Sequence, residues 1–160
     1  MTTIGFHPHN HAHCIDSGVT AAAKSCAAQG LQLTDVRRRV LEILLEQHRA
    51  LGAYDILETL RAEGLGSQPP VAYRALDFLT KHGFAHKIQR LNKFIACSDI
   101  GGDHTPAFLI CTGCDLVAEA HLETSTGRLS KAAAAVGFAI ERVALEAEGL
   151  CQSCREKSVV

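Results

Sequence analysis

The amino-terminal half of the chain carries apolar residues at the spacing of helices. A stripe that begins after Thr34 is typical of an amphipathic helix, and threonine is a residue type that caps helices. Residues 53–64 and 68–83 repeat the pattern, and the second of these begins with two prolines, which suit a first helical turn. An Ala-rich segment, residues 17–29, comes earlier and stops at Gly30. The pattern therefore predicts four helices before residue 84.

After these helices the spacing changes to that of strands. "FAHKIQRLNKFIAC" (residues 84–97) predicts two short strands joined around residues 90–92. "SDIGGDHTP" follows, and its glycines and proline are typical of a linker. The remaining predicted elements are strands over 107–111 and 115–122, a helix over 124–136 and a strand over 139–147. The chain is therefore expected to be α+β, and three helices followed by a hairpin have the order of a winged helix-turn-helix.

Charge is unevenly distributed along the chain, although the net charge is only −1. Residues 24–93 hold 11 Lys and Arg against 7 Asp and Glu, whereas residues 94–160 hold 5 against 9. A basic front half favours a polyanion as its partner. No apolar run is long enough to span a membrane and no signal-peptide pattern is present, so we expect a cytoplasmic protein with no membrane partner.

The fourth predicted helix has the composition of a DNA-recognition helix. Tyr73 and Arg74 lie in its first turns and Lys81 at its end. In helix-turn-helix proteins the first residues of the second helix face base edges, where arginine suits guanine and tyrosine can reach a phosphate or a thymine methyl group. Arg37, on the second helix, is one of several basic residues that could contact phosphates. The alternative is a solvated amphipathic helix that binds nothing, because charged helix faces are common.

Two Cys-x-x-Cys pairs, Cys111 with Cys114 and Cys151 with Cys154, lie at or just beyond predicted strand ends. Four thiolates are the usual ligands of a structural zinc ion, and in the cytoplasm paired cysteines are more often metal ligands or redox groups than disulfides. A redox dithiol would use one pair at the start of a helix, which fits a duplicated motif poorly. A closed site of four cysteines leaves no position for water, so sensing a metal would need a second, weaker site.

The order of several motifs resembles the ferric uptake regulator (Fur) family, and within it the zinc-responsive branch. These are "PPVAYRALDFL", "GFAHKI", "FIAC", "HTPAFLICTGC" and "GLCQSC", and the resemblance covers about residues 17–155. It implies an N-terminal winged helix-turn-helix DNA-binding domain, joined by a hinge to a C-terminal α/β dimerisation domain. Members of the family are typically homodimers that repress transcription from palindromic operators in double-stranded DNA when metal is bound, and not enzymes.

The resemblance also places the domain boundaries and the metal ligands. Residues 1–15 are polar, His-rich and without periodicity, so we expect a flexible tail there. The resemblance implies the winged helix over 16–97, the hinge over 98–105 and the dimerisation domain over 106–160. The two cysteine pairs become the structural zinc site. The regulatory zinc ligands at the family's positions are His86, Cys97, His104 and Glu119. Two zinc ions per chain are therefore expected.

The regulatory set is chemically sensible apart from the resemblance. Two imidazoles, a thiolate and a carboxylate can surround zinc tetrahedrally, and an ion held by all four would fix the angle between the domains. Taken singly each residue is a weak signal, since a lone histidine in a hairpin is more often structural or facing solvent. His121, two residues beyond Glu119, could join a further metal site.

Departures from the family pattern bear on the choice of metal and of helix cap. The hinge reads "GGDHTP" and lacks the His-rich run of iron- and peroxide-sensing relatives, which favours zinc. The recognition helix lacks the threonine of the family's usual Thr-Val-Tyr-Arg, so Ser67 could provide the cap. The prediction is a zinc-sensing repressor of zinc-uptake genes. The alternatives are an iron-, manganese- or peroxide-responsive regulator of the same family, or a zinc hydrolase, against which the thiolate as fourth ligand argues.

Overall fold

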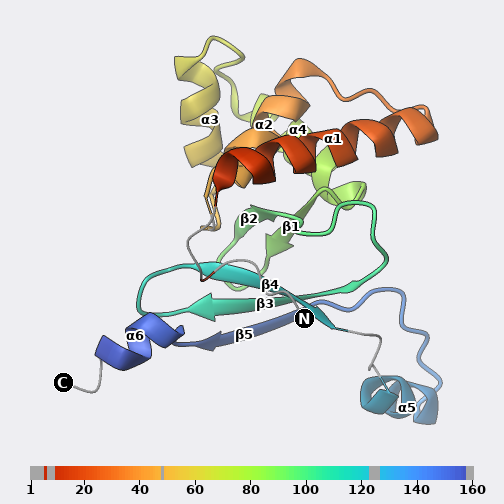
Figure 1. The fold of residues 1–160 in the computed structure, drawn as a ribbon. Coiled ribbons are helices and arrows are strands. Elements are labelled where there is room, and N and C mark those ends of the chain that lie inside the picture. The colour runs from red at the N-terminus through yellow and green to blue at the C-terminus, as the bar shows by residue number, and fades with distance from the viewer. Residues whose placement is uncertain (1–5, 7–9, 48, 123–126, 158–160) are drawn as a thin grey trace.

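The computed structural model describes residues 1–160 except 1–5, 7–9, 48, 123–126 and 158–160. Helices and the two small sheets follow in the order α1 (His11–Gln29), α2 (Asp35–Leu45), α3 (Ala53–Ala62), α4 (Pro69–Lys81), β1 (Ala85–Ile88), β2 (Lys93–Ala96), β3 (Thr105–Cys111), β4 (Val117–Leu122), α5 (Gly127–Ala135), β5 (Leu145–Gly149) and α6 (Gln152–Lys157). Figure 1 shows α1–α4 as one layer, the three-stranded sheet as a second, and the β1–β2 hairpin between them. None of the described helices combines the length and apolarity needed to cross a membrane.

The helical layer forms as the apolar pattern predicts. The Thr34 hydroxyl accepts a hydrogen bond from the Arg37 N–H at 3.4 Å and caps α2. The apolar faces of α2, α3 and α4 meet in one buried cluster, which Phe84 joins from the turn after α4. The prediction that Ser67 caps α4 is wrong. The N-cap is Gln68, whose side chain makes no capping bond, and the helix starts on its prolines, whose missing N–H groups need no partner.

The hairpin confirms the predicted winged helix. β1 and β2 are antiparallel, with Ala85 opposite Ala96 and Ile88 opposite Lys93. Asn92 takes a positive φ of 50° in the connecting turn, a conformation that asparagine tolerates better than most residues. The open end of the hairpin, at Ala85 and Ala96, packs against the helical core, whereas Ile88 and Ile95 pack against residues of the three-stranded sheet.

The second domain is a three-stranded sheet in the order β4-β3-β5, antiparallel between β3 and β4 and parallel between β3 and β5. The third strand was predicted over 139–147 but begins at Leu145. Its pairing with β3 starts opposite Ala107. The residue before Ala107 is Pro106, which has no N–H to extend the ladder. Helix α6 was not predicted.

The first helix begins earlier than its apolar pattern indicated. Asn10 Oδ1 accepts the Ala12 N–H at 3.0 Å and caps α1 at His11, so residues 11–15, predicted as tail, are helical. Ile15 and Val19 both contact the helical core, which extends the buried face of α1 backward. Most of the remaining predicted tail lies outside the described residues.

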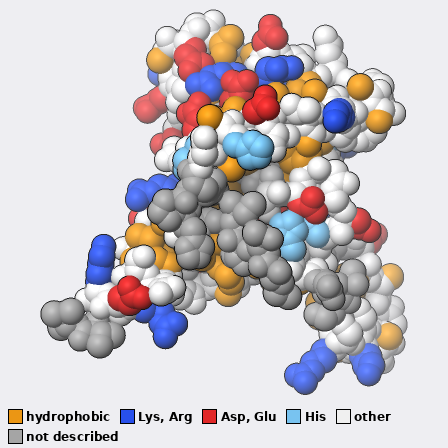
Figure 2. Space-filling view, viewed as in Figure 1, with side chains coloured by type: hydrophobic (Ala, Val, Ile, Leu, Met, Phe, Trp, Pro, Cys, Tyr) orange, Lys and Arg blue, Asp and Glu red, His pale blue; other side chains and the backbone are white. Residues whose placement is uncertain are grey.

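The two domains share a second apolar cluster. It joins residues of the wing and of the sheet: Ala50, Ile88, Ile95, Phe108, Ile110 and Val117. Arg49 also forms a backbone bridge with Leu116, and Figure 2 shows histidine side chains reaching the surface at the level between the helices and the sheet. The wing is therefore packed against the second domain, and the hinge lies beside this contact.

Candidate metal-binding sites

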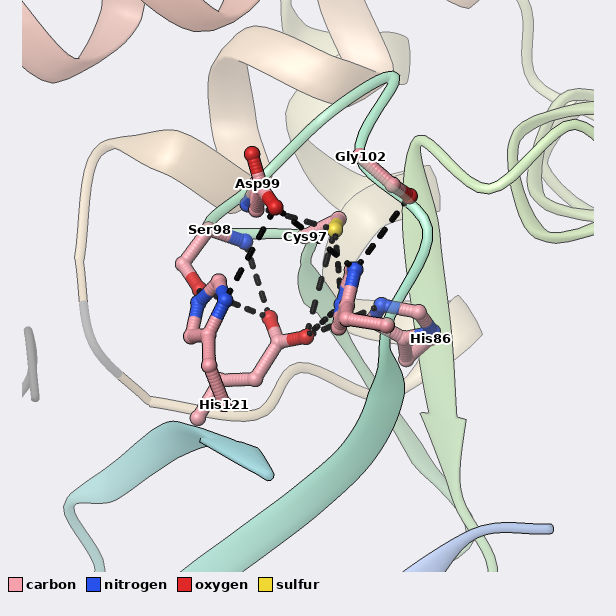
Figure 3. Close-up of polar contacts among 8 residues, drawn as sticks. His86, Cys97, Ser98, Asp99, Gly102 and His121 are labelled. Atoms are coloured by element: carbon pink, nitrogen blue, oxygen red, sulfur yellow. Dashed lines mark hydrogen bonds and ion pairs between the residues drawn. The ribbon is translucent and has the colours of Figure 1, made fainter. Parts of the chain in front are cut away.

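Four predicted ligands converge where the wing, the hinge and the sheet meet. His86 comes from β1 and Cys97 from the residue after β2, while His104 ends the hinge and Glu119 lies on β4. One ligand atom from each lies within 4.8 Å of all the others. Figure 3 shows His86 and Cys97 directed toward the centre of this group. We call these four residues the inner site.

The distances in the inner site suit a tetrahedral cation. Glu119 Oε1 lies 2.7 Å from His104 Nε2 and 3.2 Å from His86 Nε2, and Cys97 Sγ lies 3.7 Å from His104 Nε2. Around zinc, such ligand atoms sit about 3.3 to 3.7 Å apart, so only small shifts are required. His86 Nε2 is buried and lies 3.2 Å from Glu119 Oε1, but it makes no hydrogen bond of acceptable geometry with any residue that the structure describes. A buried nitrogen left in this state indicates a missing partner, and a metal ion would provide one.

The protonation states of Glu119 and Cys97 in the inner site follow from burial and from the neighbouring polar groups. Burial alone would raise the pKa of Glu119, but the charge of the neighbouring His86, the Ser98 N–H at 2.8 Å and the hydrogen bond with His104 lower this pKa to about 2. Burial raises the pKa of the Cys97 thiol to about 12, and the neighbouring Glu119 carboxylate adds to the rise. Without a metal, the carboxylate is therefore ionised and the thiol is protonated.

The four paired cysteines also come together. Cys111 ends β3, Cys151 follows β5, and their partners lie in the adjoining turn and in α6. Cys114 Sγ and Cys151 Sγ are 3.8 Å apart, close to the ~3.8 Å between thiolates on a tetrahedral zinc ion and far from a disulfide bond of about 2.05 Å. The Cys151 N–H donates to Cys111 Sγ at 3.3 Å and lowers the pKa of that thiol to about 6. The arrangement can therefore hold a thiolate-ligated cation.

A second cluster adjoins the inner site and shares one residue with it. Asp99, His104 and His121 place ligand atoms within 4.8 Å of one another. His121 was predicted as an accessory ligand. Asp99 was missed, although its place two residues after Cys97 is a signal that could have found it. Ser98 was also missed: its hydroxyl donates to Glu119 Oε2 at 3.1 Å and lies 2.8 Å from His121 Nε2.

Three of the four predicted DNA contacts are free to reach a ligand. Tyr73, Arg74 and Lys81 are exposed on α4. Arg37 is engaged within the protein, because its guanidinium lies 3.8 Å over the Phe78 ring and donates to the Gln32 carbonyl at 2.6 Å. The exposed face of α4 is therefore the better supported part of the predicted interface.

A family model described as the ferric uptake regulator family matches residues 28–148. The chain belongs to the ferric uptake regulator family. Two curated relatives, each named "Zinc uptake regulation protein", come from Escherichia coli (strain K12) and Shigella flexneri. Each is 39% identical to this chain over 136 residues, covering 84% of the chain and 80% of the relative. Members of the family regulate transcription rather than catalyse reactions, so the hydrolase alternative is set aside.

Solved structures of similar sequence differ in how closely their shape matches this protein. A zinc uptake regulator complexed with zinc and DNA has a TM-score of 0.86 at 36% identity, covering 91% of this chain and 98% of its own. The holo form of XcZur has a TM-score of 0.80 at 35% identity, and the match covers 88% of this chain and 99% of the XcZur chain. The apo form of XcZur has a TM-score of 0.51 at 36% identity, and the match covers 89% of this chain and 99% of the XcZur chain. Because the identities are nearly equal, the difference lies in shape. This Fur-family protein therefore resembles the zinc- and DNA-bound regulator and holo XcZur in overall shape more than it resembles apo XcZur.

Proposed function

We propose that this protein is a zinc-dependent transcriptional repressor that binds palindromic operator DNA as a homodimer. The observation that carries the proposal is the inner site. It draws ligands from the wing, the hinge and the second domain in a structure shaped like relatives described with zinc. The names of the curated relatives support zinc uptake as the regulated process, and DNA-bound regulation is consistent with the predicted cytoplasmic location.

The inner site is the proposed sensor because it spans the hinge. His86 and Cys97 move with the wing, whereas Glu119 moves with the sheet. A bound zinc ion would supply positive charge that offsets the buried carboxylate and a Cys97 thiolate. All four residues can bind one ion only when the wing is packed against the second domain. Converting a mostly open population to a mostly closed one requires differential binding of roughly 5 kcal/mol, which four ligands can provide.

The four-cysteine cluster is proposed to hold a second, permanent zinc ion. It would tie the end of β3 to the segment after β5, and a closed thiolate site leaves no position at which water could react. This gives two zinc ions per chain, one structural and one regulatory.

DNA recognition is assigned to the exposed face of α4. In a dimer the two α4 helices would enter successive major grooves about one helical turn apart, or a multiple of it. Tyr73 and Arg74 would face the bases, and Lys81 the backbone. Closing the hinge would then set the distance between the two helices.

The variant His104→Ala tests the sensor assignment. It removes one ligand supplied by the hinge, so we expect a folded dimer with one zinc ion per chain and no zinc-dependent DNA binding. His13→Ala, which removes an exposed histidine from α1, is the matched control and should behave as the wild type. Metal analysis and operator-binding titrations measure both. A normal zinc response in His104→Ala would contradict the assignment, and a response to iron or manganese alone would favour the rival regulator.

A further inference from the structure

The inner site is largely closed to solvent, whereas the neighbouring cluster is open. The side chain of Glu119 is 2% exposed and that of His104 is 10% exposed. Asp99 and His121, by contrast, are 49% and 35% exposed. His104 belongs to both groups. We call Asp99, His104 and His121 the outer triad.

The outer triad is spaced for an ion rather than for hydrogen bonds. Asp99 Oδ2 lies 3.9 Å from His104 Nδ1 and 3.8 Å from His121 Nδ1. Both separations are too long for a hydrogen bond. They are only slightly wider than the ~3.4 Å between nitrogen and oxygen ligands on tetrahedral zinc. Figure 3 shows Asp99 and His121 lying on the same side of the group, next to Ser98.

The Asp99 carboxylate lies against the backbone of Gly102, in space that a side chain there would fill. A Cβ atom built on Gly102 would collide with both carboxylate oxygens of Asp99. Gly102 therefore leaves the space into which the carboxylate folds. A side chain at Gly102 would therefore displace the Asp99 carboxylate, so a substitution at Gly102 can disturb the outer triad without changing any of its three residues.

His104 faces the two sites with different nitrogens. Nε2 lies 2.7 Å from Glu119 in the inner site, whereas Nδ1 faces Asp99 and also lies 3.4 Å from the Gly102 carbonyl. A neutral imidazole offers one lone pair, so it binds a metal through only one of its nitrogens at a time. Occupation of the outer triad and of the inner site by zinc would therefore exclude each other. That is the behaviour of a transfer step, not of a storage site.

We propose that the outer triad captures zinc from solution and passes it to the inner site through His104. With zinc on Nδ1, the His104 Nε2–H would donate to Glu119 Oε1. During transfer the inner ligands would replace Asp99 and His121, the imidazole proton would return to Nδ1 through solvent, and the Cys97 thiol would release its proton to water. The proposal rests on the proposed function, since it concerns how the sensor site is filled.

The test is the rate of zinc loading into protein whose four-cysteine site is already filled. Zinc is presented as its complex with a chromophoric chelator and followed by stopped-flow absorbance. Asp99→Asn and Gly102→Ala should each slow loading by about tenfold or more, the range by which loss of a supporting group weakens metal binding. Zinc release into excess chelator should slow by the same factor, so that the final zinc content and the DNA affinity at saturating zinc stay unchanged.

Asp103→Asn is the matched control, because it removes an exposed hinge carboxylate outside the triad and should load at the wild-type rate. Wild-type loading in Asp99→Asn would overturn the proposal. So would a loss of equilibrium zinc affinity without a slower release, because Asp99 would then only support the inner site. A third zinc bound stably beside a filled inner site would also overturn it. If the wild type itself takes up no second zinc, the proposed function fails instead.

Discussion

At the scale of single residues, the protonation of Cys97 and Glu119 decides how zinc binding depends on pH. The pKa of Cys97 near 12 keeps the thiol protonated at neutral pH, so zinc must displace that proton. Glu119, with a pKa near 2, releases none. We expect Cys97 to release about one proton per regulatory zinc, and the apparent affinity to fall about tenfold for each unit of lower pH.

Calorimetry in buffers of different ionisation enthalpy measures this proton directly. The expected heat of binding changes with the buffer in proportion to the proton released. Cys97→Ser, which keeps a side chain of similar shape without the thiol, should lose this part of the buffer dependence. A wild-type heat that is the same in every buffer would show that Cys97 is not deprotonated on binding.

The sequence identified the residues with distinctive metal chemistry and missed the residues that support them. His86, Cys97, His104 and Glu119 were predicted through the family resemblance, and the structure brings them together. Ser98 has no motif of its own, and the only signal for Asp99 is its place two residues after Cys97. Their roles follow from the path of the hinge, which folds Ser98 onto Glu119 and Asp99 toward two histidines.

At the scale of elements, the turn of the wing is held by strand β5. The backbone N–H groups of Gln89 and Arg90 donate to the two carboxylate oxygens of Glu146 at 2.6 and 2.9 Å. Arg90 Nε also lies 3.3 Å from Glu148. These contacts join the two domains at a distance from the hinge, and they must break if the domains separate. Glu146 therefore stabilises the closed arrangement independently of zinc.

Glu146→Ala should weaken both functions of the closed form. The apparent zinc affinity of the inner site and the DNA affinity at limiting zinc should fall together, because zinc and DNA both bind the closed form and the variant lowers its population. Glu146→Gln keeps one acceptor oxygen and should lie between this variant and the wild type. Glu141→Ala, exposed ahead of β5, is the control. A fall in DNA affinity with unchanged zinc affinity would contradict this role.

Element types followed from the apolar pattern, whereas several boundaries depended on particular contacts. The wing and helices α2–α4 form where the apolar spacing predicts them, and α2 also has its predicted Thr34 cap. The start of β5 was missed because Pro106 limits the ladder on the neighbouring strand, and the start of α1 because Asn10 caps it beyond the segment with clear periodicity. Helix α6 has too few residues for its spacing to give a signal.

At the scale of the whole molecule, the proposed function requires two domains whose packing depends on a removable ion, and a separate cysteine cluster that keeps its metal. The shared apolar cluster and the Glu146 contacts favour the closed form, but they contain no metal ligand. In the proposed function, zinc at the inner site is the component that varies with supply. Its occupancy should therefore set the affinity for DNA.

The most direct test is an operator-binding titration of the wild-type dimer against buffered free zinc, with the metal content measured at every point. The account predicts about one zinc per chain in protein that binds the operator weakly, rising to about two as tight binding appears. Equal operator affinity at one and at two zinc ions per chain would contradict it.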